Sequence, residues 1–148
     1  MNIVSNVNLS ADLKKFNHPS KTAQGEPRAS VSFKQLDTLW FNTGTLCNIA
    51  CKTCYIESTP RNDRLVYLTL DDVKVYLDEI ERENLGTQEI GITGGEPFMN
   101  SDIIRILNLA LLRKFNVLVL TNAMKPMMKH KGALLKLKST FGARLTIR

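Results

Sequence analysis

The fold is decided by residues 88–121, QEIGITGGEPFMNSDIIRILNLALLRKFNVLVLT, in which two short strand patterns enclose one helix pattern. Residues 88–93 and 116–121 are the strand patterns, and the unbroken apolar run of the second is typical of a strand buried on both faces of a parallel sheet. Between them, Ser101 is a predicted helix N-cap. The helix after it carries apolar residues on one face, namely Ile103, Ile104, Leu107 and Leu111. The segment therefore predicts a βαβ unit.

The same alternation of strand and helix precedes this segment. Residues 38–43 form a strand pattern, and residues 44–68 form a long connection. Thr69 is a predicted N-cap for a helix over 70–84, and Gly86 is its predicted C-terminal stop. The helix carries apolar residues at helical spacing, namely Val73, Leu77 and Ile80.

The alternation also continues after the segment. Residues 130–139 form a weaker helix pattern, and residues 144–148 begin a fourth strand. The predicted strands start near residues 88, 116 and 144, a regular rhythm that implies a parallel sheet with right-handed crossovers. We expect an α/β fold of parallel βα repeats that form a partial TIM-type barrel, because a complete barrel needs about 250 residues. The chain of 148 residues is expected to be truncated at about the fourth strand.

The chain is short enough to be one domain with a lead-in. Residues 1–36 are polar and irregular, so we expect an N-terminal arm there and a core domain over 37–148. Hydrophobic residues make up 43% and charged residues 23%, as in folded soluble proteins. The sequence has no apolar run of the roughly 20 residues that cross a bilayer, and its N-terminus does not resemble a secretion signal. We expect a cytoplasmic protein without membrane contacts.

The net charge of +6 is concentrated in one part of the chain. Residues 113–148 hold nine Lys or Arg residues and no Asp or Glu. A basic tract can attract nucleic acid. Here neither interleaved aromatic residues nor a known nucleic-acid module accompanies it, which favours a solvated helix face. A nucleic-acid partner is therefore not expected.

All three cysteines lie in the long connection after the first predicted strand. Cys47, Cys51 and Cys54 form a C-x3-C-x2-C array, and an odd, clustered set argues against a disulfide framework. Three thiolates this close can bind one soft metal centre. In an iron–sulfur cubane, where each iron takes one protein ligand, they would leave one iron open. The alternatives are buried thiols or a zinc site completed by His18 or His130, although structural zinc sites usually pair short Cys elements.

A second motif, Gly94-Gly95-Glu96-Pro97, directly follows the strand predicted over 88–93. The carboxyl ends of neighbouring parallel strands meet at one edge of the sheet, so we expect this turn beside the cysteine connection. The two glycines permit positive φ and a close approach to a ligand. Glu96 offers a carboxylate suited to a ligand ammonium group. Taken by itself, the tetrapeptide is also compatible with a plain strand-to-helix turn.

Together, the cysteine array and the Gly-Gly-Glu-Pro turn resemble the radical S-adenosylmethionine (SAM) superfamily over residues 37–148. The resemblance implies a [4Fe–4S] cluster held by Cys47, Cys51 and Cys54, with SAM chelating the open iron. It also implies an enzyme that cleaves SAM reductively to a 5′-deoxyadenosyl radical, which takes a hydrogen atom from a substrate. By matching position, the methionine amino group would be held by Gly94, Gly95 and Glu96.

Three further positions are interpreted through the same resemblance. Many family members have an aromatic residue just before the third cysteine, near the adenine, whereas this chain has Thr53 there and Tyr55 after the cysteine. At Thr53, backbone contacts could still hold the adenine of SAM. Tyr55 is expected either to replace the missing aromatic contact with the adenine or to be an ordinary core residue. Asn122 follows the third predicted strand at the same edge, where it could touch cofactor or substrate or could make a turn.

The resemblance also implies partners. It implies a flavodoxin- or ferredoxin-like electron donor and an unknown substrate, either a small molecule or a peptide. The two motifs look most like the branch with pyranopterin synthases and peptide- or sulfatase-modifying enzymes. A non-catalytic iron–sulfur or cofactor-binding fragment is the second hypothesis, because half a barrel cannot shield a carbon radical from water.

Overall fold

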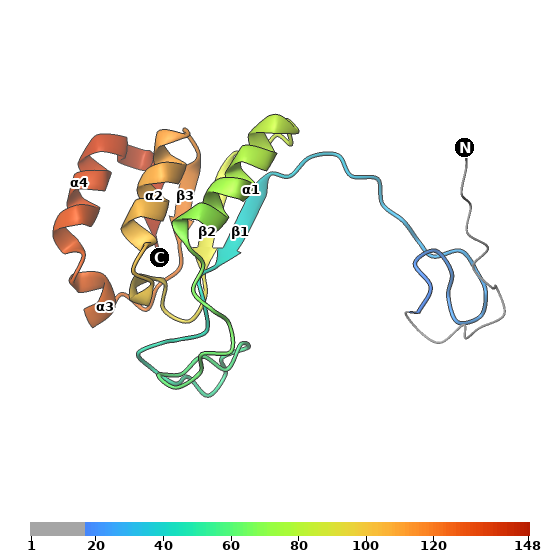
Figure 1. The fold of residues 1–148 in the computed structure, drawn as a ribbon, viewed down its shortest axis with the longest axis horizontal. Coiled ribbons are helices and arrows are strands. Elements are labelled where there is room, and N and C mark those ends of the chain that lie inside the picture. Colours follow the sequence, from blue (N-terminus) through green and yellow to red (C-terminus); the bar gives the residue numbers. More distant parts are fainter. Residues whose placement is uncertain (1–16) are drawn as a thin grey trace. The chain divides into compact units, whose positions relative to one another are not determined.

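A computed structural model describes residues 17–148, and in it the chain divides into two compact units (Figure 1). Of the described residues, 17–34 belong to the first unit and 35–148 to the second. In the described part of the first unit, Lys21 and Pro27 form an antiparallel bridge around a tight turn. The named helices and strands belong to the second unit. None of the described helices is long and apolar enough to cross a membrane.

The second unit contains one sheet with the strand order β1-β2-β3-β4. Its strands are β1 (Thr38–Asn42), β2 (Glu89–Thr93), β3 (Asn116–Val119) and β4 (Leu145–Ile147). All neighbouring pairs are parallel. Because each strand lies beside the one before it in the chain, the sheet winds like a TIM-type barrel and not like a doubly wound fold, whose strand order reverses. The predicted α/β fold of parallel βα repeats is confirmed as an open sheet of four strands.

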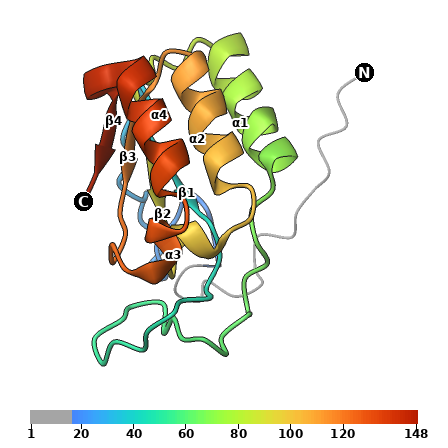
Figure 2. The same cartoon turned by 90° about the vertical axis from the view of Figure 1, so that its left-hand side faces the viewer.

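The longer helices cover one face of this sheet (Figure 2). They are α1 (Leu70–Arg82), α2 (Ile103–Leu112) and α4 (Lys131–Phe141). Short helical turns occupy three connections, namely η1 (Pro97–Met99), α3 (Lys125–Met128) and η2 (Gly142–Arg144). The helices and the sheet enclose an apolar core whose fully buried members include Leu77, Ile90, Ile106, Leu107 and Val119. Burial of this apolar surface is the main force that holds the βα layers together.

The beginning of α1 agrees with the sequence, whereas its end does not. The Thr69 hydroxyl accepts from the Asp72 N–H, and the Asp72 carboxylate accepts from the Thr69 N–H over 2.9 Å, which is a capping box. The helix ends at Arg82, before the stop predicted at Gly86. The physical reason is that Asn84 already takes a left-handed φ of 49°, a conformation that Asn tolerates better than most residues.

The predicted N-cap of α2 is wrong by one residue. Asp102 takes the cap position, whereas Ser101 is exposed. The Asp102 carboxylate accepts from the Leu70 N–H over 3.0 Å and pairs with Arg105 over 2.9 Å. Asp102 therefore joins the first turns of two helices, a contact that the local sequence does not reveal. The predicted apolar face of α2 is present, with Ile104 half-buried at its margin.

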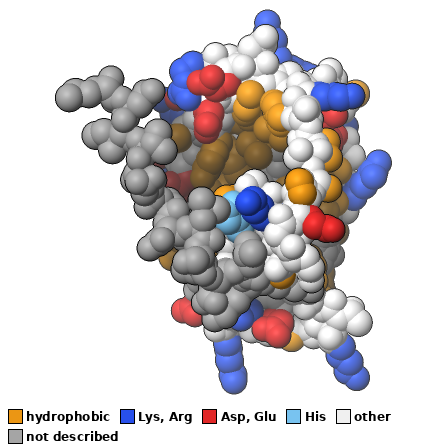
Figure 3. All heavy atoms as spheres, turned by 90° about the vertical axis from the view of Figure 1, so that its right-hand side faces the viewer, with side chains coloured by type: hydrophobic (Ala, Val, Ile, Leu, Met, Phe, Trp, Pro, Cys, Tyr) orange, Lys and Arg blue, Asp and Glu red, His pale blue; other side chains and the backbone are white. Residues whose placement is uncertain are grey.

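β3 is buried on one face only, which corrects the prediction of a strand buried on both faces. Val117 and Val119 pack into the core, whereas Leu118 is half-buried and Leu120 is 39% exposed. The physical reason is that the longer helices all lie on the same side of the sheet (Figure 2). The opposite side carries the two leucines and the exposed Trp40, and Figure 3 shows hydrophobic side chains gathered on this side.

The connection after β3 contains a helical turn that the sequence did not predict. α3 places Pro126 in its first turn, where the missing N–H of proline loses no helical hydrogen bond. Met127 packs against the core from this turn. The helix predicted over 130–139 is present as α4 and extends to Phe141.

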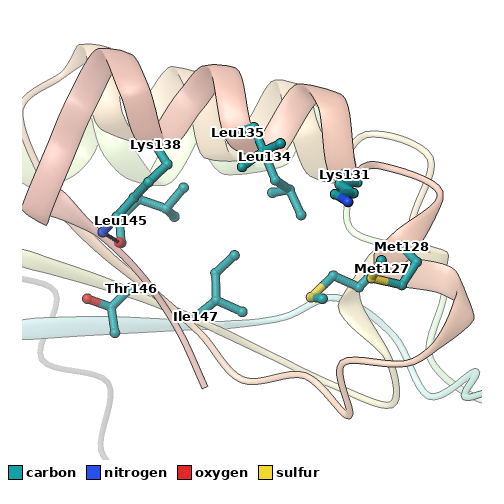
Figure 4. Close-up of a pocket in the computed structure, with 9 residues that line it drawn as sticks. All are labelled: Met127, Met128, Lys131, Leu134, Leu135, Lys138, Leu145, Thr146 and Ile147. Atoms are coloured by element: carbon teal, nitrogen blue, oxygen red, sulfur yellow. Dashed lines mark hydrogen bonds between the residues drawn. The ribbon is translucent and has the colours of Figure 1, made fainter.

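An apolar groove runs along the edge strand β4 (Figure 4). It has a volume of about 470 Å³ and lies between the helical segments α3 and α4 and the strand. Its apolar lining residues include Met127, Leu134, Leu135 and Ile147. The core therefore reaches the surface at this end of the described sheet.

The burial pattern of α2 gives a matched pair of stability predictions. Leu111→Ala removes a fully buried side chain, whereas Leu112→Ala removes its neighbour, which is 61% exposed. We expect Leu111→Ala to lower the free energy of unfolding by about 2–5 kcal/mol, because it leaves a cavity in the core. Leu112→Ala should lower it by less than about 1 kcal/mol. Urea denaturation followed by circular dichroism measures both, and equal losses would contradict the orientation of this helix.

Candidate functional site

The connections after β1, β2 and β3 lie at the carboxyl ends of these strands (Figures 1 and 2). The turn after β2 is hydrogen-bonded to the beginning of the cysteine connection. The Gly95 N–H donates to the Gly44 carbonyl over 2.9 Å, and the Glu96 N–H donates to the Leu46 carbonyl over 3.0 Å. The two sequence motifs are therefore adjacent in the folded chain.

The two glycines are required by the packing of this turn against the cysteine connection. Gly94 has a φ of 142°, and a Cβ atom there would lie 2.8 Å from the Thr43 hydroxyl oxygen. A Cβ atom on Gly95 would lie 2.2 Å from the Leu46 carbonyl oxygen, which no real side chain tolerates. From the sequence we expected the glycines to let a ligand come close. In the structure it is the backbone of the cysteine connection that lies close to them. Their contact with the amino group of SAM stays a prediction.

Glu96 is a buried carboxylate, only 1% exposed, that is satisfied within the chain. Its two oxygens accept from the Phe98 N–H over 3.1 Å and from the Asn122 N–H over 3.0 Å. The Thr121 hydroxyl lies 2.8 Å and 2.9 Å from the same two oxygens. The carboxylate thus joins the turn after β2 to the end of β3. These donors matter because burying a carboxylate without hydrogen-bond donors costs free energy. Its expected role toward an ammonium group stays a prediction.

Asn122 connects this carboxylate to the cysteine connection. Its amide nitrogen donates to Asn48 Oδ1 over 2.9 Å and lies 3.8 Å from Cys47 Sγ, within the range of an N–H···S hydrogen bond. Its amide oxygen accepts from the Met124 N–H over 3.0 Å. Residues that follow all three strands therefore form one continuous polar network.

The three cysteines differ in their exposure along the loop. Cys47 is buried, Cys54 is half-buried and Cys51 is exposed. The Cys47 N–H donates to the Thr59 carbonyl over 3.2 Å, and the Cys54 N–H donates to the Cys51 carbonyl over 3.2 Å. Within residues 17–148, no three Cys, His, Asp or Glu side chains are gathered as metal ligands. The assignment of the cysteines as cluster ligands therefore stays a prediction.

The surroundings of Cys54 suit a thiolate that binds a soft metal. The Ser58 backbone N–H, 3.3 Å from Cys54 Sγ, lowers the pKa of this thiol below its usual value. Metal binding uses the deprotonated thiol, so this hydrogen bond favours it. The Ser58 hydroxyl is buried; it also helps to lower the pKa of Cys54 and has no other hydrogen-bond partner in the described part of the chain. Thiolates are soft metal ligands, and the sulfides of an iron–sulfur cluster can accept a hydrogen bond from a buried hydroxyl such as that of Ser58. These residues therefore fit such a cluster.

The remaining predicted contacts lie outside this network. Thr53 is exposed and Tyr55 is 80% exposed. Of the two alternatives for Tyr55, the core position is wrong, and contact with adenine stays a prediction for both residues. His130, considered as a zinc ligand, places its ring 6.0 Å from that of Phe98. His18, the other candidate, belongs to the first unit.

Sequence reasoning missed three polar residues that shape the site. Thr121 was expected only to end a predicted strand, and no role was predicted for Asn48. Asn100 was not noted, although it is buried and donates to the carbonyls of Leu68 over 2.8 Å and Thr43 over 3.4 Å. Hydroxyl and amide residues are common in turns and loops, so their type alone carries no signal for such contacts.

Known proteins resemble most of the second unit in sequence. The family model described as "Radical SAM superfamily" matches residues 41–147. An S-adenosylmethionine-dependent nucleotide dehydratase of Selenomonas ruminantium is 34% identical over 76 residues, which are 51% of this chain and 26% of that protein. A GTP 3′,8-cyclase of Pasteurella multocida is 26% identical over 90 residues, which are 60% of this chain and 26% of the cyclase. The chain therefore spans about a quarter of the length of these relatives.

A solved structure shares the fold. The crystal structure of Streptococcus suis SuiB bound to S-adenosylmethionine matches with a TM-score of 0.60 over 78% of this chain and 24% of the SuiB chain. The sequence identity is 21%, so the likeness concerns the fold alone. It supports the parallel βα arrangement of the second unit.

The approach of Gly95 to Leu46 gives a prediction about the junction of the two motifs. Gly95→Ala would place a methyl group 2.2 Å from the Leu46 carbonyl oxygen, so the turn and the cysteine connection must separate. We expect the free energy of unfolding to fall by about 2–4 kcal/mol. Gly132→Ala is the matched control, because its new methyl group meets no atom within 4 Å. It should stabilise α4 by up to about 1 kcal/mol, since Ala is the better helix former. In urea denaturation, an unchanged stability of Gly95→Ala would contradict the close approach.

Proposed function

The chain belongs to the radical SAM superfamily, and we propose that residues 37–148 are a core domain that binds a [4Fe–4S] cluster and SAM and starts radical chemistry on a substrate. The observation that carries this proposal is the polar network in which Glu96, Asn122 and Cys47 are linked. It supports a single site built from the cysteine loop and the Gly-Gly-Glu-Pro turn. Both relatives described above are named as enzymes, which supports a catalytic role.

Each part of the cofactor would have its own set of contacts. The cluster would be held by the three thiolates, the methionine end of SAM by residues 94–96, and adenine by the backbone at Thr53 or the ring of Tyr55. Asn122, which the sequence allowed either to touch cofactor or substrate or to make a turn, would reach the cofactor through Cys47. When bound, the cluster and SAM would together supply one-electron radical chemistry that removes a hydrogen atom from the substrate.

The chain's own groups would hold this site. The Glu96 carboxylate ties the turn after β2 to the end of β3, and the backbone N–H groups of Gly95 and Glu96 hold this turn against the cysteine connection. The Ser58 hydroxyl would donate to the cofactor bound at Cys54.

The proposal includes an electron donor and a substrate. A flavodoxin- or ferredoxin-like protein would supply the electron. The substrate would be a small molecule or a peptide, and the names of the nucleotide dehydratase and the GTP cyclase favour a small molecule. A nucleic-acid partner is not part of the proposal. The proposal does include a cytoplasmic location, because thiols that bind metal stay reduced there.

A non-catalytic iron–sulfur or cofactor-binding module is the second candidate. The observation that favours it is the exposure of the sheet face opposite the helices, where Trp40 is 45% and Leu120 is 39% exposed. A carbon radical formed beside an open face would meet water, whereas control of such species depends on excluding it. This module would assemble the cluster without cleaving SAM.

Anaerobic reconstitution with iron and sulfide distinguishes the two candidates. We expect about four irons per chain, and release of 5′-deoxyadenosine from SAM after dithionite is added. A cluster without 5′-deoxyadenosine would support the binding module. Zinc in place of iron in protein purified without air would contradict both.

Cys51→Ala tests the ligand assignment. We expect iron content and visible absorption of the reconstituted chain to fall to background, because a cluster with a missing thiolate is not held. Lys52→Ala is the matched control, since Lys52 is an exposed neighbour on the same loop, and it should retain the cluster. A Cys51→Ala chain that keeps its cluster and cleaves SAM would show that Cys51 is not a ligand.

A further inference from the structure

We infer that Asn122 is a positioning residue for the sulfur of Cys47, to which its side-chain amide donates an N–H···S hydrogen bond. The inference rests on the proposed function where the cluster is concerned. For the metal-free chain it rests on the contacts of Asn122 alone. Those contacts give its backbone N–H, its amide oxygen and its amide nitrogen defined partners.

The backbone of Asn122 is anchored by the buried carboxylate. Its N–H donates to Glu96 Oε2 over 3.0 Å, and the hydroxyl of Thr121 lies 2.9 Å from the same oxygen. The Ala123 N–H donates to the Thr121 hydroxyl oxygen over 3.0 Å. Because Glu96 is 1% exposed, water does not readily replace these bonds. The chain therefore leaves β3 on a path that delivers Asn122 to the cysteine loop.

The orientation of the Asn122 amide follows from its partners. The oxygen accepts from the Met124 N–H over 3.0 Å, which fixes this end as the acceptor. The amide nitrogen carries two hydrogens, and its two partners are Asn48 Oδ1 at 2.9 Å and Cys47 Sγ at 3.8 Å. A flipped amide would set its oxygen against the Asn48 oxygen and its N–H groups against the Met124 N–H. The N–H therefore points to the sulfur.

Asn48 is oriented by the same turn. Its amide nitrogen lies 3.7 Å from the sulfur of Met124, so its oxygen faces Asn122. Asn122 is thus held from both ends by residues 121–124 and by the residue that follows Cys47. The side chain has no freedom to turn away from the sulfur without breaking this set of bonds.

A donor at this place matters because Cys47 is only 5% exposed. Water has little access to the sulfur, and the Asn122 amide supplies it with a protein N–H donor. The backbone of Cys47 is held by the Thr59 carbonyl over 3.2 Å, and the Asn122 amide holds its side chain. Hydrogen bonds to the sulfurs of a cluster stabilise its reduced form and raise its reduction potential. Asn122 would therefore both place Cys47 and tune the cluster.

The contact can be tested in the metal-free chain with Cys47 as the only thiol. The sequence holds three cysteines, so Cys51→Ser combined with Cys54→Ser leaves Cys47 alone. In this background, Asn122→Ala should raise the rate of Cys47 alkylation by iodoacetamide about tenfold, because the cysteine loop loses its attachment to the end of β3. An unchanged or lower rate would overturn the inference.

Two further variants separate positioning from loss of fold. Asn116→Ala removes the same side chain from the exposed start of β3 and should leave the alkylation rate unchanged. Circular dichroism shows whether Asn122→Ala is folded. If it is not, Asn122→Asp replaces it, since its carboxylate still accepts from the Met124 N–H but puts an acceptor beside the sulfur. The rate should differ from that of the wild type in Asn122→Asp as well, because the N–H donor is lost and a carboxylate beside the sulfur opposes the thiolate that iodoacetamide attacks. An unchanged rate would overturn the inference.

In the reconstituted protein, the readout is the midpoint potential of the cluster. Asn122→Ala should make this potential more negative and change the electron paramagnetic resonance spectrum of the reduced cluster, whereas Asn116→Ala should change neither. Equal potentials for the wild type and Asn122→Ala would overturn the role toward the cluster. If the wild-type chain assembles no cluster, the proposed function fails, and the alkylation rates still decide whether Asn122 positions Cys47.

Discussion

The buried carboxylate of Glu96 is the interaction on which the rest of the site depends. Its donors come from η1 and from the end of β3, so two connections must approach until Phe98, Thr121 and Asn122 all reach it. A buried charge left without donors would be costly, which makes this approach obligatory. Gly95 lets the cysteine connection join them, because the Leu46 carbonyl fills the space of a side chain. Packing and proposed chemistry therefore depend on the same few residues.

The architecture could be predicted from the sequence because its signals are local and repeated. The capping box of α1 forms between Thr69 and Asp72, which lie within one helical turn. Strand patterns over 88–93 and 116–121 enclose a helix, and such a unit has few alternatives to a parallel arrangement. The adjacency of the cysteine array and the Gly-Gly-Glu-Pro turn then followed from strand direction alone, since the carboxyl ends of parallel strands share an edge.

The features that could not be predicted depend on residues far apart in the chain. Asp102 displaces Ser101 as the cap of α2 while its carboxylate bonds Leu70, 32 positions away. The exposure of Leu120 depends on which face of the sheet the helices cover, and no apolar run encodes that choice. Asn48 meets its partner 74 positions away. Such contacts exist only once the sheet has formed, so neither the spacing of residues nor their type predicts them.

The central claim is that three thiolates and the neighbouring turn form one site, in which one iron is left for SAM. Mössbauer spectroscopy of the chain reconstituted with iron-57, before and after SAM is added, tests this most directly. The account predicts that about one quarter of the iron signal shifts when SAM binds, while the thiolate-bound iron stays as it was. A spectrum that SAM leaves unchanged, or one in which all of the iron shifts together, would contradict it.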